Sequence, residues 1–243
     1  KEVEVANENL IRDLMKRIAP LMKEDIARAL KQFGTSGGVE YCEHIGNLPI
    51  KNWYQGNFKE GAKRISGQAM ANTILTNRYH CGRCVINCGR VVKAVDGPYK
   101  GIEIGGPEYE TIALLGSNCL INDLSVVVKA NELCNRYGLD TISTGGVIGF
   151  AMEAYERGLI TKKDTGGIKP TWGNSSALIE MIHCIAQRKG LGELLGNGVR
   201  QAADIVGGAA HEFAIHVKGL EPPAHDPRAR FSIALGYATS NRG

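Results

Sequence analysis

The sequence predicts a mainly α-helical fold, a multihelical domain with one small β-hairpin near a cluster of cysteines. Apolar residues recur at helical spacing along most of the 243 residues, pairs of glycines separate the periodic segments, and only one short stretch alternates as paired strands do. Hydrophobic residues make up 43% of the chain, which is enough for a sizeable core.

The N-terminal part of the chain is predicted to begin with two helices. Apolar residues recur every three or four positions over residues 9–18 and again over 23–33, and Gly34 is placed to end the second helix. Residues 35–58 are rich in Gly, Asn, Trp and Tyr without a clear period, so we expect an extended, loop-like stretch there. A further helix is expected from that stretch to about Asn77.

The hairpin and most of the helices are predicted after the cysteines. Residues 91–95 alternate weakly, Asp96-Gly97 supplies a turn, and residues 102–104 form the returning strand. Helical spacing predicts further helices over residues 109–115, 123–136, 146–157, 175–189 and 199–206. A short strand is expected over residues 213–217.

The domain organisation is read from one linker candidate, Lys218-Gly-Leu-Glu-Pro-Pro-Ala224. We therefore expect residues 1–217 to form one helical domain that carries the clustered cysteines. Residues 218–243 would be the linker and the start of another domain. Both ends read as cuts within a longer protein.

Composition excludes several classes of protein. The net charge is +4 and no run of Lys or Arg is present, which argues against a nucleic-acid-binding role. The longest apolar runs are far shorter than a membrane span, and no signal peptide is recognisable. Seven cysteines, an odd number without secretory features, predict a reduced, cytoplasmic protein rather than a disulfide framework. Four of them are scattered and are expected to be small buried hydrophobic residues: Cys42, Cys119, Cys134 and Cys184.

The other three cysteines, Cys81, Cys84 and Cys88, have C-x2-C-x3-C spacing. A tight turn can point such thiolates at one metal centre, and we expect Gly82 to permit that turn and Gly89 to let the chain leave it. Soft thiolates select zinc, copper(I) or an iron–sulfur cluster.

A [4Fe–4S] cluster with three near cysteines and one distant cysteine fits this spacing best, because zinc normally takes a second ligand pair downstream. The alternatives are a structural zinc site that adds His80, or three buried cysteines on a turn. The fourth cluster ligand stays open: Cys42 and Cys119 are candidates, and a residue beyond Gly243 is another.

Four motifs follow one another in a fixed order, and together they carry a family resemblance. They are the cysteine cluster, Gly106-Pro-Glu-Tyr-Glu-Thr111, Asn135-Arg-Tyr-Gly-Leu-Asp-Thr-Ile-Ser143, and His225-Asp-Pro-Arg228 leading to Tyr237-Ala-Thr-Ser240. In this order the chain resembles the aldehyde:ferredoxin oxidoreductase family of tungsten enzymes over nearly its whole length.

The resemblance implies a fold and an activity. Residues 1–217 would be the family's central helical domain, and residues 218–243 would open its C-terminal helical domain. The implied reaction oxidises a small aldehyde to a carboxylic acid at a tungsten (or molybdenum) bis-pterin, and electrons leave through a [4Fe–4S] cluster to ferredoxin or a similar acceptor. A homo-oligomer is compatible with it.

The resemblance also assigns site residues. Cys81, Cys84 and Cys88 match the cluster ligands, and Glu110 matches the family's active-site glutamate. Glu110 would act as a general base if burial raised its pKa. An ordinary role is also open, because carboxylates near a helix start are favoured by the helix dipole.

Four residues match the family's D-x-x-G-L-D pterin-binding pattern: Asn135, Gly138, Leu139 and Asp140. Asn135 departs from the pattern, because Asn stands where Asp is typical and a charge is lost. The same stretch also reads as a helix that ends at a glycine cap, and both readings can hold together.

His225-Asp-Pro-Arg228 reads as a turn around Pro227, and no catalytic role is assigned to His225. Two other functions stay open. One is the tungsten subunit of an aromatic-ring reductase of the benzoyl-CoA type, and the other is a structural zinc-binding module.

Overall fold

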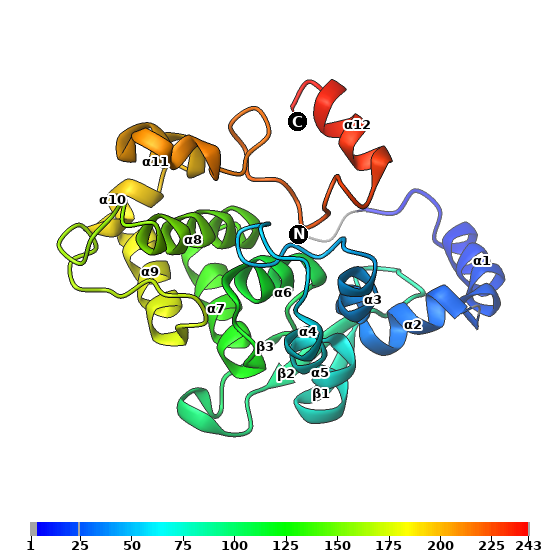
Figure 1. Cartoon of the computed structure of the whole chain (residues 1–243). Coiled ribbons are helices and arrows are strands. Elements are labelled where there is room, and N and C mark those ends of the chain that lie inside the picture. The colour runs from blue at the N-terminus through cyan, green and yellow to red at the C-terminus, as the bar shows by residue number, and fades with distance from the viewer. Residues whose placement is uncertain (1–3, 24, 243) are drawn as a thin grey trace.

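The computed structural model describes residues 4–23 and 25–242 (Figure 1). Its α-helices are α1 (Glu8–Ile18), α2 (Asp25–Phe33), α3 (Val39–His44), α4 (Lys59–Ile65), α5 (Gly67–Thr73), α6 (Tyr109–Leu115), α7 (Leu124–Tyr137), α8 (Thr141–Glu156), α9 (Ser175–Gln187), α10 (Leu191–Leu195), α11 (Val199–Val206) and α12 (Phe231–Thr239). Short 3-10 helices are η1 (Ala19–Lys23), η2 (Thr35–Gly38), η3 (Gly97–Tyr99), η4 (Ser117–Cys119) and η5 (Gly208–Glu212). The strands are β1 (Leu75–Tyr79), β2 (Gly89–Lys93) and β3 (Glu103–Gly105). The prediction of a mainly α-helical fold is confirmed.

The two N-terminal helices are confirmed, and the segment after them differs from the prediction. Asn7 caps α1, its side chain accepting a hydrogen bond from the Leu10 amide at 2.9 Å, and Gly34 ends α2 with φ of 64°. The stretch over 35–58 is not wholly loop-like, because it contains η2 and α3. These elements are too short to show a hydrophobic period.

The small sheet has three antiparallel strands in the order β1-β2-β3. The predicted hairpin is β2 and β3, in which Val92 pairs with Ile104. The single helix expected to reach about Asn77 is instead two helices, α4 and α5, because Ser66 between them is extended and caps α5. Helix α5 ends at Thr73, and β1 follows it and pairs with β2. All but one of the β1 residues are exposed, so this edge strand carries no apolar alternation that sequence could show. Because β1 and β2 are joined by residues 80–88, the clustered cysteines lie in a hairpin loop.

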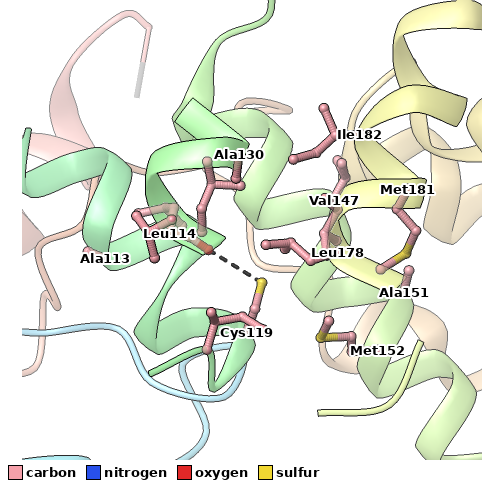
Figure 2. Close-up of a cluster of buried hydrophobic side chains, with 14 of the residues drawn as sticks. Ala113, Leu114, Cys119, Ala130, Val147, Ala151, Met152, Leu178, Met181 and Ile182 are labelled. Carbon is pink, nitrogen blue, oxygen red and sulfur yellow. Dashed lines mark hydrogen bonds between the residues drawn. The ribbon is translucent and has the colours of Figure 1, made fainter. Parts of the chain in front are cut away.

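The core lies between α6, α7, α8 and α9 (Figure 2). Helix α8 begins at Thr141, five residues earlier than predicted, because Asp140 caps it by accepting a hydrogen bond from the Ser143 amide at 2.7 Å. Gly145 lets α8 approach α6 closely, since a Cβ there would lie 2.5 Å from the Leu114 carbonyl oxygen. In the described part of the chain no single helix is long and apolar enough to cross a membrane. Tyr109–Cys119 and α7 reach that length and composition only as a pair bent by 119°.

The last part of the chain contains two helices that were not predicted, α10 and α12. The strand expected over 213–217 is wrong: only one isolated bridge forms, between Val217 and Leu220. Phe213 is instead buried against Phe150, with ring centroids 5.2 Å apart. Helix α12 has no buried residue and stands apart from the helical core in Figure 1.

Candidate active site

The cysteine loop is built by two non-glycine residues in the left-handed region. Arg83 has φ of 60° and Asn87 has φ of 61°, whereas Gly82 does not have positive φ, so the expectation that Gly82 makes the turn is wrong. The Cys84 amide donates to the Cys81 carbonyl at 2.9 Å and closes the tight turn between the first two cysteines. Gly89 is needed for close approach, because a Cβ there would lie 2.6 Å from the Tyr79 carbonyl oxygen.

The three loop cysteines are free thiols on one accessible segment. Cys81 is exposed, and Cys84 and Cys88 are half-buried. Their chemistry suits an iron–sulfur cluster, since thiolates are the ligands such clusters use. Within the described residues, however, no three His, Cys, Asp or Glu side chains converge as a metal site. The loop therefore supplies ligands of the type that such a cluster uses.

Two candidates for the fourth ligand have other surroundings. Cys119 is fully buried in the core, where its thiol donates to the Leu114 carbonyl at 3.4 Å (Figure 2) and burial raises its pKa. Cys42 is buried beside Asn47, whose Nδ2 lies 3.4 Å from its Sγ. Neither one forms a metal-binding group with the loop cysteines in the part of the chain that the structure describes. Burial was predicted for both as scattered cysteines and is confirmed for them and Cys134, while Cys184 is half-buried.

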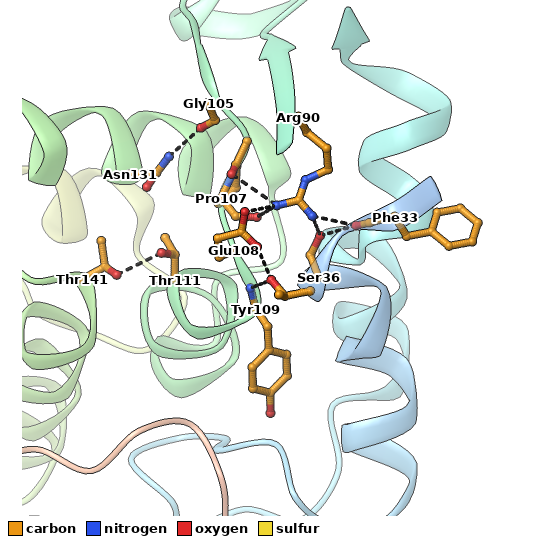
Figure 3. Close-up of polar contacts among 12 residues, drawn as sticks. Phe33, Ser36, Arg90, Gly105, Pro107, Glu108, Tyr109, Thr111, Asn131 and Thr141 are labelled. Atoms are coloured by element: carbon orange, nitrogen blue, oxygen red, sulfur yellow. Dashed lines mark hydrogen bonds and ion pairs between the residues drawn. The ribbon is translucent and has the colours of Figure 1, made fainter. Parts of the chain in front are cut away.

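A buried arginine connects the cysteine loop to the segment that precedes Glu110 (Figure 3). Arg90 follows Cys88 by two residues and is only 1% exposed. Its guanidinium donates to the Phe33 carbonyl at 2.7 Å and to the Pro107 carbonyl at 3.2 Å, and it pairs with Glu108 at 2.8 Å.

The same contacts fix the start of α6. Glu108 accepts a hydrogen bond from the Thr35 hydroxyl, and that hydroxyl oxygen in turn accepts one from the Tyr109 amide at 3.0 Å. Thr35 thus satisfies an amide at the helix N-terminus that no residue of α6 itself caps. The first turn of α6, which carries Glu110, is held by contacts that begin at β2, the strand that follows the cysteine loop.

Both carboxylate oxygens of Glu110 face other residues. Oε2 accepts a hydrogen bond from the Ala224 amide at 2.6 Å, and Oε1 lies 3.6 Å from His225 Nε2. Burial raises the pKa of Glu110, Asp140 raises it further, and the Ala224 amide and His225 oppose the increase. The general-base role expected for Glu110 required such a shift in this direction.

Two further contacts hold His225 beside Glu110, and the sequence analysis did not predict them. Its ring stacks on Tyr109 with centroids 5.1 Å apart, and its Nδ1 lies 2.8 Å from Asn47 Nδ2. The Tyr109 hydroxyl donates to the Ala224 carbonyl at 2.7 Å. Asn47 and His225 are 178 positions apart, so no local pattern could reveal the pair.

Three of the four residues named for the D-x-x-G-L-D pattern line a pocket of about 400 Å³. Its wall includes Asn135, Leu139 and Asp140. Gly138 ends α7 with φ of 67°, as expected for a glycine cap. Asn135, which departs from the family pattern, donates from its Nδ2 to the Asn131 carbonyl one turn earlier in α7, at 2.8 Å.

The rest of this pocket comes from the sheet, from the segment between β3 and α6, and from helices α6, α7 and α8. Its other lining residues are Tyr79, Ile104, Gly105, Gly106, Glu108, Thr111, Asn131 and Thr141. The Thr111 and Thr141 hydroxyls are 2.9 Å apart (Figure 3). Hydroxyl, amide and carboxylate groups around an open pocket suit a polar heterocycle such as a pterin, so the residues present fit that group.

A second pocket of about 350 Å³ adjoins the first and shares Asp140 with it. Its wall combines apolar residues, including Leu220 and Pro223, with Glu221 and Tyr237. Burial and the nearby Glu110 and Asp226 carboxylates raise the pKa of Tyr237 to about 12.

The turn expected at His225-Asp-Pro-Arg228 is present. Asp226 is 4% exposed and accepts from the Arg228 amide at 2.8 Å and from its guanidinium at 2.6 Å. Arg228 also donates to the Trp53 carbonyl at 2.7 Å. Its partners are therefore structural, and Asp226 raises the pKa of Arg228.

Comparison with known proteins places these features in a family. Residues 10–243 match the model described as aldehyde ferredoxin oxidoreductase, domains 2 & 3. The chain is 44% identical, over 88% of its length, to a tungsten-containing aldehyde ferredoxin oxidoreductase of Thermococcus kodakarensis, and 40% identical over 100% to one of Pyrococcus horikoshii. It is 33% identical, over 88% of its length, to the aliphatic sulfonate oxidoreductase, WOR-like subunit, of Pyrococcus furiosus, and it covers 35% of that protein.

The structural comparison agrees with this fold. The active site complex BamBC of benzoyl coenzyme A reductase matches with a TM-score of 0.72 at 20% identity, over 96% of this chain and 36% of the other. The chain spans 34% of the Thermococcus relative and 40% of the Pyrococcus horikoshii relative. The order of motifs, the helical fold and these matches together show that the chain belongs to the aldehyde ferredoxin oxidoreductase family and corresponds to its domains 2 and 3.

Proposed function

We propose that this chain is part of a cytoplasmic oxidoreductase that oxidises a small aldehyde to a carboxylic acid and passes two electrons to ferredoxin. The observation that carries the proposal is the connection of three features through one network. Arg90, on the strand that follows the cysteine loop, contacts Pro107 and Glu108 directly before α6, and Glu110 lies in the first turn of that helix. The names of the relatives support the same reaction class.

Two groups of residues would hold the cofactors. Cys81, Cys84 and Cys88 would bind a [4Fe–4S] cluster, with a fourth ligand from elsewhere. Asn135, Leu139 and Asp140, which line the pocket, would contact a tungsten or molybdenum bis-pterin there, and Gly138 would shape the turn between them. When bound, the pterin-held metal supplies the two-electron oxidation.

Glu110 would act as the base that accepts a proton in the reaction. Conversion of an aldehyde and water to a carboxylic acid releases two protons and two electrons, so a base must accept a proton from water or the hydrated substrate. A half-buried carboxylate with a raised pKa suits that task near neutral pH. The Ala224 amide fixes one of its oxygens.

The test is the longest native protein that contains this chain, purified anaerobically together with its Glu110→Gln and Cys84→Ser variants. We expect tungsten, iron and sulfide in the ratio of a [4Fe–4S] cluster, and aldehyde oxidation coupled to ferredoxin reduction. Glu110→Gln should lower kcat by roughly 10²-fold or more with metal content unchanged. Cys84→Ser should lose the electron paramagnetic resonance signal of the cluster.

Two outcomes would replace the proposal. Zinc without iron or tungsten would indicate a structural zinc module. Reduction of an aromatic thioester without aldehyde oxidation would favour an aromatic-ring reductase of the benzoyl-CoA type, a possibility kept because this chain shares the fold of the BamBC complex.

A further inference from the structure

We propose that His225 is a positioning residue for Glu110, and that Asn47 sets the tautomer of His225 so that its Nε2–H points at the Glu110 carboxylate. The inference deepens the proposed function, because it rests on Glu110 being the reactive base. It adds two residues that neither the family motifs nor sequence reasoning assigned.

The geometry joins three separate parts of the chain. Glu110 is in the first turn of α6, Asn47 follows α3, and His225 precedes α12. The imidazole lies between the other two side chains, with Nδ1 at 2.8 Å from Asn47 Nδ2 and Nε2 at 3.6 Å from Glu110 Oε1. The second distance is that of an ion pair and is slightly longer than a hydrogen bond.

Stacking on Tyr109 fixes the plane of the imidazole. The two rings are inclined by only 16°, and the Tyr109 hydroxyl is tied to the Ala224 carbonyl. The Ala224 amide donates to Glu110 Oε2. The segment 224–225 therefore contacts both carboxylate oxygens, one through its backbone and the other through the imidazole.

The amide of Asn47 determines which ring nitrogen carries the proton. An amide NH₂ only donates, so Nδ1 must accept, and a neutral His225 then carries its proton on Nε2. Asn47 is 1% exposed and its Oδ1 is buried without a hydrogen-bond partner. Such an orphaned acceptor is costly unless another state of the site uses it.

The imidazolium state provides that use. Once both ring nitrogens are protonated, rotation of the Asn47 amide would place Oδ1 against Nδ1–H. The Cys42 thiol, now 3.4 Å from Nδ2, could then donate to the same oxygen. Asn47 can thus satisfy both charge states of His225, whereas a purely structural asparagine would need only one orientation.

Among the charged and titratable groups around Glu110 and His225, His225 has a distinct effect on the protonation of Glu110. Asp140 at the start of α8 and Tyr237 of α12 interact electrostatically with Glu110. Asp226 interacts in the same way with Tyr237, and Arg230 and Cys42 with Tyr109. Of the groups that face Glu110, His225 is the one that becomes a cation. Protonation of His225 therefore favours the ionised, base-competent form of Glu110.

The test is nuclear magnetic resonance of this chain without metal, following the His225 ring nitrogens and the Glu110 carboxyl carbon against pH. We expect neutral His225 as the Nε2–H tautomer. In Glu110→Gln, which keeps the shape and removes the charge, the tautomer should not change, because Asn47 and not the carboxylate selects it. His183, whose Nδ1 contacts the Tyr137 hydroxyl at 2.9 Å, is the internal control and should not move.

Reciprocal variants separate positioning from packing. His225→Phe keeps the stack on Tyr109 and should raise the Glu110 midpoint, while His225→Gln, which restores an N–H donor, should return part of the shift. Asn47→Leu, which removes the amide donor, should let the Nδ1–H tautomer of His225 become populated. An Nδ1–H tautomer in the unsubstituted chain, or a Glu110 midpoint unchanged in His225→Phe, would overturn the proposal. This experiment uses no metal or substrate, so a failed aldehyde assay would not affect the interaction between His225 and Glu110. If that interaction is observed but Glu110→Gln keeps its activity, only the catalytic role of Glu110 is refuted.

Discussion

The region around Glu110 and the cysteine loop carry the two halves of the proposed chemistry, and they are organised differently. Glu110, His225 and Asn47 are held at defined distances by helix termini and by stacking on Tyr109. The loop cysteines lie on accessible backbone between two strands, and no three potential metal ligands converge anywhere in the described chain.

The difference follows from what each region is packed against. The first turn of α6 leads directly into fully buried residues such as Ile112 and Leu115, so the protein core fixes it. The cysteine loop instead follows β1, an edge strand whose residues are mostly exposed, and connects it to β2. Protein contacts order the first region, whereas we expect the cluster itself to order the second. Arg90 is where the two meet, because it lies on β2 beside the loop and contacts the segment before α6.

The largest expected effect is that of Arg90→Met. It would remove hydrogen bonds to the Phe33, Gly106 and Pro107 carbonyls and leave those groups without partners. We expect a loss of about 3 kcal/mol in the free energy of unfolding, measured by urea denaturation.

Arg83→Met is the matched control, since Arg83 pairs with Glu8 at the surface, where both side chains are about half exposed. It should cost less than about 0.5 kcal/mol. Equal losses in the two variants would mean that the cysteine loop is as tightly integrated as β2, which would remove the contrast between the regions.

The second effect concerns the close contact of α8 with α6. Gly145→Ala would place a methyl group 2.5 Å from the Leu114 carbonyl oxygen. We expect a net loss of about 1–2 kcal/mol, because overpacking outweighs the gain in helix propensity. Gly236→Ala on α12, where a Cβ would meet nothing within 4 Å, should instead be neutral or slightly stabilising. Thermal unfolding of both variants tests this, and a stabilised Gly145→Ala would show that the two helices can separate at no cost.

These contrasts also explain which elements sequence could predict. The bounds of α6 and α11 agree with the prediction because their apolar periodicity begins and ends where the helices do. Helix α8 was placed too late, since its start depends on Asp140 as a cap and on glycines that fit against α6. Strand β1 and helix α12 bury almost nothing, so neither has a pattern of burial to read.

The site divides in the same way. The cysteine spacing, Glu110 and Asp140 could be proposed from the sequence because each belongs to a short motif. The contacts of His225, Asn47 and Arg90 could not, although His225 also lies in a motif, because these contacts join distant segments, 178 positions apart in one case. A buried arginine on a strand gives no local signal that separates it from an exposed one.

The third expected effect is a dependence of the free energy of unfolding on pH, caused by Glu110. The folded-state pKa of Glu110 is raised above its ordinary value, mainly by burial, so the protonated form is favoured by folding. Its contribution to stability is present at low pH and is lost as the pH rises through the folded pKa. Glu110→Gln removes that loss, so the variant should gain stability relative to wild type as the pH rises above 4.5. Denaturation midpoints at several pH values measure it, and a difference independent of pH would contradict the raised pKa.

The smallest expected effect on folding is that of Cys84→Ser in the metal-free chain, and it contrasts with a large expected effect of the same variant on cluster binding. Cys84 is a half-buried free thiol on the cysteine loop, so its replacement should change the free energy of unfolding by less than about 0.5 kcal/mol. After anaerobic treatment with iron and sulfide, only the wild type should acquire the brown absorption of a cluster. Cys119→Ser is the opposite control: its hydroxyl would be fully buried in the apolar core, so it should cost more stability than Cys84→Ser while sparing iron binding. If Cys84→Ser unfolded the chain, the loop would be a structural element in its own right, and the distinction between a region ordered by packing and one ordered by its cluster would fail.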